Sequence, residues 1–430
     1  MSTPVIQVLV GFQTTTGFGN PFQLDSATFG LLNTGTLGGL AYADLTDLVE
    51  FVSIARGRNR DLDQFNAGIA TVTFNNVTRV LDPLNDASIY YPYVLPRAPI
   101  QILADGIPIY TGLVVDWNLD YDISNQDKMY AQCADAFTVL ANQSLEAFTP
   151  SAELSSARVS TVLDRPEIAY QGARNIGTGS STLGAYAVTE NTNVLNYLQL
   201  VTKSEQGYIY IAADGTLTYK GRSAVLNPVA DAAFAANGTG INYQTLINQF
   251  GDELLYNDIV TESPAGGPFN ATDTASQALY QSQQYAATDL LNSTASEVEQ
   301  LGQYLLGKYA NPVLRFTGVT TQLAALTAAQ QTAALTLDLT DIAEVQKNYV
   351  TGNPPSVTQT LIVSGVRHTI TPQNHIIGFT FESTDQNAYL ALNDEIFGKL
   401  EGTSPYESAM AYDEAGIQYN NFSAGNLLGF

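Results

Sequence analysis

The sequence predicts a mainly β protein that carries a smaller α+β insertion. Short runs of β-branched and aromatic residues, separated by closely spaced turn signals, fill residues 1–148 and favour a barrel or sandwich over a parallel sheet. Helical periodicity concentrates in residues 149–226, and strand candidates return in residues 227–386. Residues 387–430 show few periodic signals, so we expect a tail that becomes ordered only against a partner.

The composition limits the class of protein. A chain of 430 residues suggests about three domains, and its 45% hydrophobic content is ample for packed cores. The single cysteine, Cys133, excludes a disulfide framework or a cysteine-rich zinc site within one chain. The sequence has no run of about 18 apolar residues and no signal-peptide pattern. We therefore expect a soluble protein without a membrane-spanning segment, not secreted by the usual route.

The charge is strongly acidic, with a formal net charge of -24 and a pI near 4.1. Such a balance argues against a protein that grips nucleic acid, because phosphate binding needs clustered Lys and Arg. It is compatible with a passage whose acidic wall repels phosphate and lets DNA slide past. Charge alone does not separate that role from plain solubility.

The most distinctive local feature is a cluster of cations in a chain that has only 17 Lys and Arg. Arg56, Arg58 and Arg60 close a strand-like run and are followed by Asp61 and Asp63. A second β-rich run occupies residues 69–74. We interpret this stretch as two strands joined by a charged, ordered corner, where arginine can hold carboxylates bidentately.

Further elements follow in chain order. Alternating apolar residues predict an amino-terminal strand over residues 5–11, and Asp105-Gly106 is a strong turn signal for a hairpin over residues 99–110. We then expect a strand over residues 112–121, its partner over 129–135 and a short helix over 136–145. In the α+β part we expect a helix that Ser151 or Ser155 caps and that runs to Asp164, a helix capped by Asn191 or Thr192, and a hairpin over 208–222 that turns at 213–215. In the last part we expect loops over 263–274 and 351–356, helices over 293–309 and 324–335, and strands over 357–366, 367–370 and 376–383.

Two distant segments share a pattern. Residues 24–32 and 392–400 both fit L-[DN]-x-x-x-F-G-x-L, which places Phe29 and Phe397 at the same position of the motif. The repeated pattern suggests two related docking segments. Chance similarity explains nine loosely matched positions about as well.

The corner and its surroundings resemble a passage near the start of minor tail proteins of long-tailed bacteriophages, the baseplate or tail-tip hub family. In that family a strand ending in RGR is followed by D-x-F-x-A-G-x-A-x-V and then by D-P-L-N. The matching residues here are Arg56-Gly57-Arg58, Asp63, Phe65, Ala67-Gly68, Ala70, Val72 and Asp82-Pro83-Leu84-Asn85, and the likeness continues through Tyr90-Tyr91, 96–100 and 109–112. A second match, in the expected order, is the hairpin with Gly207, Asp214, Gly215, Leu217 and Arg222.

The resemblance implies two tube-like β-barrel domains, residues 1–148 and 227–386, which flank a small α+β domain over 149–226 and precede a docking tail over 387–430. It further implies a trimeric ring in the virion, assembled in the host cytoplasm, that adapts the sixfold tail tube to threefold tip or fibre proteins and lines the DNA passage. Expected partners are other copies of the chain and other tail proteins, with DNA only in transit. Arg56, Arg58, Arg60, Asp63, Phe29 and Phe397 are the expected subunit or domain contacts, and for the arginines a role within one chain is equally open.

The sequence offers little support for catalysis or metal binding. His368 and His375 lack a third ligand of fixed geometry, so we expect exposed or hairpin histidines and no metal site. No G-x-S-x-G elbow is present, and carboxylate pairs arise by chance among 41 Asp and Glu. We therefore expect no enzyme and no cofactor. The alternatives are a hexameric distal tail protein and, less favoured, an enzyme that degrades cell-wall glycan or peptide.

Overall fold

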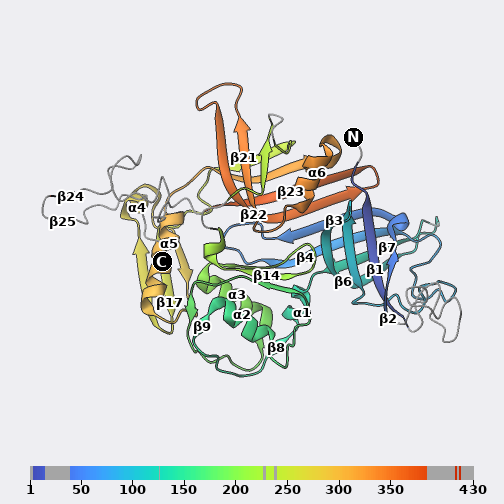
Figure 1. The fold of residues 1–430 in the computed structure, drawn as a ribbon, viewed down its shortest axis with the longest axis horizontal. Coiled ribbons are helices and arrows are strands. Elements are labelled where there is room, and N and C mark those ends of the chain that lie inside the picture. Colours follow the sequence, from blue (N-terminus) through green and yellow to red (C-terminus); the bar gives the residue numbers. More distant parts are fainter. Residues whose placement is uncertain are drawn as a thin grey trace. The chain divides into compact units, whose positions relative to one another are not determined.

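The computed structural model describes residues 3–14, 39–124, 126–225, 229–236 and 240–384, together with the pairs 412–413 and 416–417 (Figure 1). The chain divides into two units, Met1–Glu382 and Ser383–Phe430. In the second unit, β24 (Tyr412–Asp413) and β25 (Gly416–Ile417) form a short antiparallel pair. Phe29 and Phe397, and with them the shared motif, lie outside the described residues. All that follows concerns the first unit.

A single 13-stranded sheet dominates the first unit, which confirms the prediction of a mainly β fold. Its strands from the first third of the chain are β1 (Ile6–Thr14), β2 (Gly39–Asp44), β3 (Val49–Gly57), β4 (Asn66–Asn75), β5 (Pro99–Ala104), β6 (Ile107–Asp120) and β7 (Lys128–Ala134). Those from the last part are β15 (Ala232–Ala235), β16 (Thr245–Gln249), β20 (Arg315–Gln322), β21 (Ile342–Asn348), β22 (Ser356–Thr371) and β23 (Asn374–Ser383). The main path runs β16-β20-β23-β22-β3-β4-β7-β6-β5-β1-β2, and β15 pairs with β21, which pairs with β22.

The two groups of strands meet where β22 pairs antiparallel with β3. Alternation explains the pairing, because Val52 and Ile54 on β3, and Val366 and Ile370 on β22, point into one buried core. The register places Gly365 opposite Gly57 and Ile370 opposite Val52. Strands that are far apart in sequence therefore share one continuous sheet and core.

Several predicted strands are longer than expected. The Asp105-Gly106 turn is confirmed: both residues have positive φ, 50° and 79°. However, the strand predicted over 112–121 is the second half of β6, and a register shift between Val114 and Asp116 lets one strand continue past the break. Likewise, residues 357–370 form one strand, β22, which pairs with β23.

The α+β part contains three helices and three small sheets of short strands. Its helices are α1 (Phe137–Ala141), α2 (Ser155–Leu163) and α3 (Val194–Glu205), with a 3-10 turn at Arg222–Val225. Its strands are β8 (Ser144–Leu145), β9 (Glu153–Leu154), β10 (Arg174–Ile176), β11 (Thr182–Leu183), β12 (Thr192–Asn193), β13 (Tyr208–Ile211) and β14 (Leu217–Lys220). The predicted hairpin is confirmed as β13 and β14.

Three helix boundaries in this part differ from the prediction. The helix expected over 136–145 ends at Ala141, because Ser144 and Leu145 pair with β12. The residue before α2 is Leu154, without a side-chain cap, since the Ser155 hydroxyl donates to the buried carboxylate of Glu205 instead. The cap of α3 is Asn193, whose side chain accepts from the Asn196 amide.

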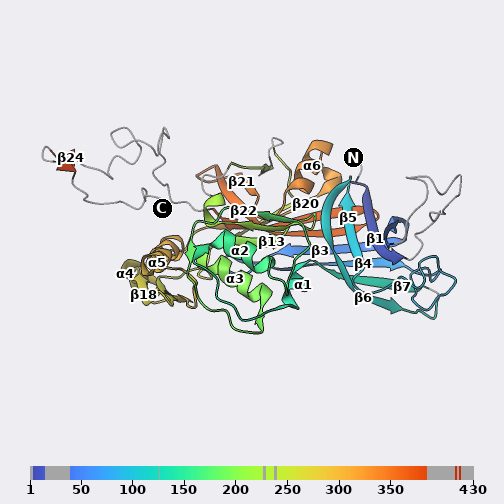
Figure 2. The ribbon, with the colours of Figure 1, turned by 60° about the horizontal axis from the view of Figure 1, so that its bottom comes forward.

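Residues 258–309 form a separate packing unit, here called the α5 module. It contains β17 (Asp258–Ser263), β18 (Gly266–Thr272), β19 (Gln284–Ala287), α4 (Thr274–Tyr280) and α5 (Ala295–Tyr309). Its own small core includes Ile259, Val298, Leu301 and Leu305. The loop expected over 263–274 is wrong, because β18 pairs with β17 despite its glycines and proline. Figure 2 shows α4 and α5 beside β18, away from β3 and β4.

Two short turns and one helix complete the unit. The 3-10 turns are Thr46–Leu48 and Leu323–Ala325, and the helix is α6 (Ala328–Thr336). Thr327 caps α6 in a capping box with Gln330, so the helix expected over 324–335 begins four residues later. No helix in the described residues is long and apolar enough to cross a membrane.

Candidate functional site

The arginine corner, residues 56–63, links β3 to β4 and is the point where three parts of the first unit meet. It begins where β3 ends at Gly57, whose φ is 101°. A Cβ at this position would overlap the carbonyl oxygen of Ser364 on β22. Only glycine therefore lets β3 approach β22 and then turn into the corner.

Arg56 ties the corner to the segment before β21 and to the β13–β14 hairpin. Its side chain is buried, and its Nη2 donates to Asp338 Oδ1 at 2.7 Å. The other carboxylate oxygen of Asp338 accepts from the Ala213 amide at 2.8 Å. Burial alone would raise the pKa of Asp338, but the Arg56 guanidinium and the hydrogen bonds hold it below its usual value. One ionised carboxylate thus joins three segments.

Arg58 ties the corner to β23. Its Nη2 and Nε donate to Glu382 Oε2 at 2.6 and 3.0 Å, and its Nη1 donates to the Asp63 carbonyl at 2.8 Å. The guanidinium also lies over the rings of Phe65 and Tyr208, 4.8 and 5.4 Å from their centroids. Burial opposes this charge, yet the carboxylates of Glu382 and Asp61 outweigh it and raise the pKa of Arg58.

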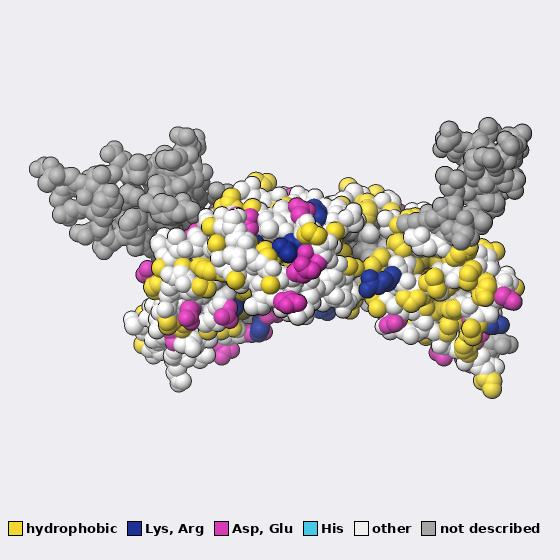
Figure 3. All heavy atoms as spheres, turned by 90° about the horizontal axis from the view of Figure 1, so that it is seen from below, with side chains coloured by type: hydrophobic (Ala, Val, Ile, Leu, Met, Phe, Trp, Pro, Cys, Tyr) yellow, Lys and Arg dark blue, Asp and Glu magenta, His cyan; other side chains and the backbone are white. Residues whose placement is uncertain are grey.

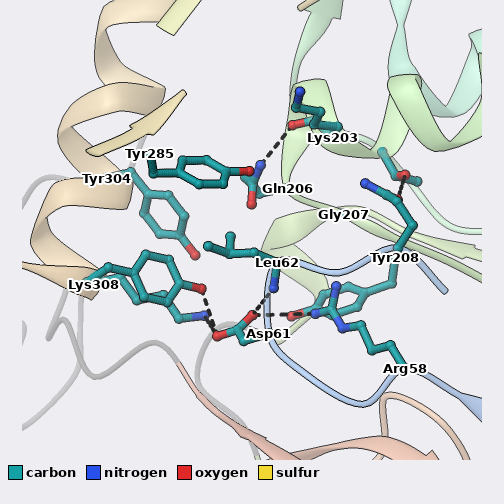
Figure 4. A pocket seen from close by; sticks show the side chains of 13 residues that line it. Arg58, Asp61, Leu62, Lys203, Gln206, Gly207, Tyr208, Tyr285, Tyr304 and Lys308 are labelled. Carbon is teal, nitrogen blue, oxygen red and sulfur yellow. Dashed lines mark hydrogen bonds and ion pairs between the residues drawn. The ribbon is translucent and has the colours of Figure 1, made fainter. Parts of the chain in front are cut away.

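Asp61 ties the corner to α5 (Figure 4). It is buried, and it accepts from the Tyr309 hydroxyl at 2.7 Å and pairs with Lys308 Nζ at 3.5 Å. Burial alone would raise the pKa of Asp61, but Lys308 and Arg58 outweigh it and keep the pKa below its usual value. The joint to the α5 module is therefore ionic at neutral pH.

Arg60 and Asp63 form the outer rim of the corner. Arg60 reaches Glu253 Oε1 at 3.3 Å and Asp63 Oδ1 at 3.4 Å. All three side chains are close to half exposed, and such pairs contribute about 0–1 kcal/mol each. The rim is thus a weak contact within the chain, in contrast with the buried pairs of Arg56 and Arg58.

A small pocket lies between the corner, the end of α3 and α5. Its wall includes Arg58, Lys203, Tyr208, Tyr285, Tyr304 and Lys308 (Figure 4). The room for water-sized molecules is about 30 Å³. This holds one or two waters, far less than the ~300 Å³ or more of a typical small-molecule site. The corner has the architecture of a structural joint.

The structure brings together all four predicted contact residues that lie in the described ranges, and every one of them has a partner in the same chain. Their role in contacts between subunits stays a prediction. Sequence reasoning missed the partners of the corner, which are Asp338, Glu382, Lys308 and Tyr309. The partners of Arg56 and Arg58 lie 282 and 324 residues away, where no local pattern marks them.

His368 and His375 lie on the β22–β23 hairpin, which is one of the two placements expected for them, and they are not exposed. Both are buried, and His368 Nδ1 lies 3.0 Å from His375 Nε2 in an imidazole–imidazole hydrogen bond. Burial lowers the pKa of His375 to about 4 and, with the neighbouring His375 and Arg56 charges, lowers the pKa of His368. In the described ranges no group of three or more His, Cys, Asp or Glu is placed to hold a metal ion.

Comparison with known proteins identifies the architecture. No protein-family profile matches the chain, and no curated protein matches it in sequence. A solved tail protein from Neisseria meningitidis MC58 aligns with 89% of this chain and 97% of its own, at a TM-score of 0.56 and 10% identity. The 43 kDa tail protein of prophage MuSo2 from Shewanella oneidensis aligns over the same shares, at a TM-score of 0.54 and 11% identity. The chain has the fold of phage tail proteins.

This tail-protein fold confirms, at the level of architecture, the resemblance that the RGR, DPLN and hairpin motifs predict. The alignments cover 89% of this chain and 97% of each solved tail protein, so the likeness extends over most of both chains. At about a tenth identical residues, the shared feature is the fold, and roles for individual side chains have to be argued from this chain.

Proposed function

We propose that this chain is a structural component of a bacteriophage tail, the hub at the tail tip or baseplate. The observation that carries the proposal is the fold shared with two tail proteins over almost their entire length. The motif resemblance to the hub family, in the same chain order, supports it further. In this role the chain builds the virion and performs no catalysis.

We propose that three copies close into a ring that adapts the sixfold tail tube to threefold tip or fibre proteins. Within the described residues, β2 and β16 stand at the two ends of the sheet path and each pairs with one strand. Such edges carry unpaired backbone groups that another strand can complete. A ring of copies joined end to end would satisfy them, with residues 1–148 and 227–386 as the two tube-like domains of each copy and 149–226 as the domain between them.

The charge of the chain fits a passage for DNA. With 41 Asp and Glu against 17 Lys and Arg, a lumen built from this chain would repel phosphate and offer DNA no sticking point. Residues 387–430 would dock on another tail component. Arg60 and Asp63, close to half exposed at the rim of the corner, are the members of the cluster that a neighbouring subunit could still reach.

Electron microscopy and mass measurement of the purified full chain, alone and in assembled tails, test the proposal. We expect rings of three copies with six similar lobes around the axis. Six equivalent copies would instead identify a distal tail ring, the alternative assignment. A chain that stays a single copy in tails, or that clears cell-wall material in a zymogram, would contradict the structural hub.

A further inference from the structure

An ordered apolar surface lies far from the arginine corner. It is formed by the loop between β4 and β5 together with the β6–β7 turn. The loop between β4 and β5 exposes Leu84, Ile89, Tyr91 and Leu95, and the β6–β7 turn exposes Ile123. Leu84 is 79% exposed, Ile89 is 68% exposed and Ile123 is fully exposed. We call these five residues the apolar platform. Figure 3 shows hydrophobic side chains gathered over this end of the first unit.

The loop that carries the platform is held in place by specific hydrogen bonds. The buried carboxylate of Asp82 accepts from Arg79 Nε at 2.8 Å, from the Tyr121 hydroxyl at 3.0 Å and from the Leu84 amide at 2.8 Å. These bonds fasten the loop to the end of β6.

Two further bonds secure the rest of the loop. The Ser88 hydroxyl donates to the Val80 carbonyl, and Trp117 Nε1 on β6 donates to the Leu95 carbonyl at 3.0 Å. The loop therefore presents its apolar side chains outward in a fixed arrangement. Binding a partner here would cost little ordering entropy. Large contiguous apolar patches that are rimmed by polar residues mark interaction sites on soluble proteins.

The charged residues around the platform indicate the charge of the partner that would cover it. Residues 76–98 and 116–128 contain six Asp and only three Lys or Arg. Of those cations, Arg79 pairs with Asp82 and Lys128 pairs with Glu50 at 2.9 Å. Asp86, Asp120 and Asp122 are exposed. A second copy of this chain would bring the same acidic rim against itself, which costs free energy at close range.

We propose that the apolar platform docks a different tail protein, whose contacting face is apolar at its centre and rimmed by Lys or Arg. This inference rests on the proposed function, because it assumes that the chain works inside a tail. It adds the surface and the chemistry of the partner, which are separate from the ring contacts at the sheet edges.

The test adds purified full-length chain to tail particles assembled from the remaining tail proteins and measures how much chain the particles take up. The variant Leu84→Glu with Ile89→Glu places charge on the platform. The control, Leu279→Glu, places charge on an equally exposed leucine of α4, 75% exposed. Thermal unfolding of each variant checks that it is folded. We expect the platform variant to be taken up at least about tenfold less well than the wild type, and the control to match the wild type.

A charge test separates partner types. Asp120→Lys with Asp122→Lys should weaken uptake, and raising the salt concentration should weaken uptake of the wild type, because both remove attraction to a basic rim.

Equal uptake of platform and control variants would overturn the inference while leaving the hub role intact. Loss of self-association in the platform variant would also overturn it, since the occupant would then be a second copy. If the wild type itself is never taken up, the proposed function fails first.

Discussion

The arginine corner makes two joints of opposite character. Towards β22 it is part of a sheet, with backbone hydrogen bonds, a glycine opposite a glycine and an apolar core that continues across the junction. Towards α5 it relies on the carboxylate of Asp61, the hydroxyl of Tyr309 and the ammonium of Lys308. The α5 module keeps its own core, separate from the main one.

The difference shows how one short segment can make a rigid junction on one side and a movable junction on the other. Burial of continuous apolar surface joins the two groups of strands into one cooperative unit. Opening a polar junction between separate cores exposes little apolar surface and costs less free energy. We therefore expect relative motion at the α5 joint. We therefore expect the sheet joint to determine global stability and the α5 joint to determine local opening.

The largest expected effect comes from breaking the sheet joint with Gly57→Ala. The new Cβ would overlap the Ser364 carbonyl in a backbone of positive φ, so we expect a loss of more than about 4 kcal/mol or a failure to fold. Gly106→Ala is the control, since its φ is also positive, 79°, but nothing lies within 4 Å of the new atom. It should cost about 1 kcal/mol. Equal melting temperatures for the two variants would contradict the sheet joint.

Next in size is Arg58→Met, which leaves Glu382 and Asp61 without their shared cation. Removing one partner of a buried pair costs about 3 kcal/mol or somewhat more. Arg60→Met removes a half-exposed arginine from the same corner and should cost less than about 1 kcal/mol. Urea unfolding of both variants measures the contrast. Similar losses would show that burial does not separate these two arginines.

The β22–β23 hairpin should make the sheet joint sensitive to acid. The folded pKa of His375, about 4, lies below its unfolded value near 6.5, so its contribution is present above pH 6.5 and is lost as the pH falls towards 4. We expect a loss of about 3 kcal/mol over that window. Thermal unfolding of the wild type and His375→Gln between pH 7 and pH 4 checks it.

The variant is needed because other groups titrate in the same window. Burial raises the pKa of Asp135 to about 7, so its contribution is present at low pH and is lost as the pH rises through that value. This acts in the opposite sense, and it cancels when the two pH profiles are subtracted. Parallel profiles for the wild type and His375→Gln would exclude His375 as the acid-sensitive element.

The smallest effect is expected for Tyr309→Phe at the α5 joint. It removes the hydroxyl that Asp61 accepts from and should cost about 1–2 kcal/mol, felt mainly as easier opening of the α5 module. Tyr280→Phe on α4 is the control, because that tyrosine is 40% exposed in the same module. Limited proteolysis should cut residues 258–309 faster only in the first variant. A matching rate in Tyr280→Phe would point to general loosening of the module.

Sequence reasoning succeeded where the signal is local. The Asp105-Gly106 turn, the helix expected over 293–309 and the β13–β14 hairpin each follow from residues close together in the sequence. It failed where long-range pairing overrides local preference: β18 forms although its Gly266-Gly267-Pro268 start predicts a loop, and His368 is buried because β22 is central in the sheet. The partners of the arginines are set by the fold, so the sequence could predict a charged corner but not which carboxylates complete it.

Hydrogen exchange of the full chain tests the two-joint account most directly. The amides of β3 and β22 should exchange only through global unfolding, while those of β17 and α5 should exchange through a lower-energy opening that Tyr309→Phe makes easier and Gly106→Ala does not. Equal protection in the sheet and in the α5 module, unchanged by Tyr309→Phe, would contradict the account.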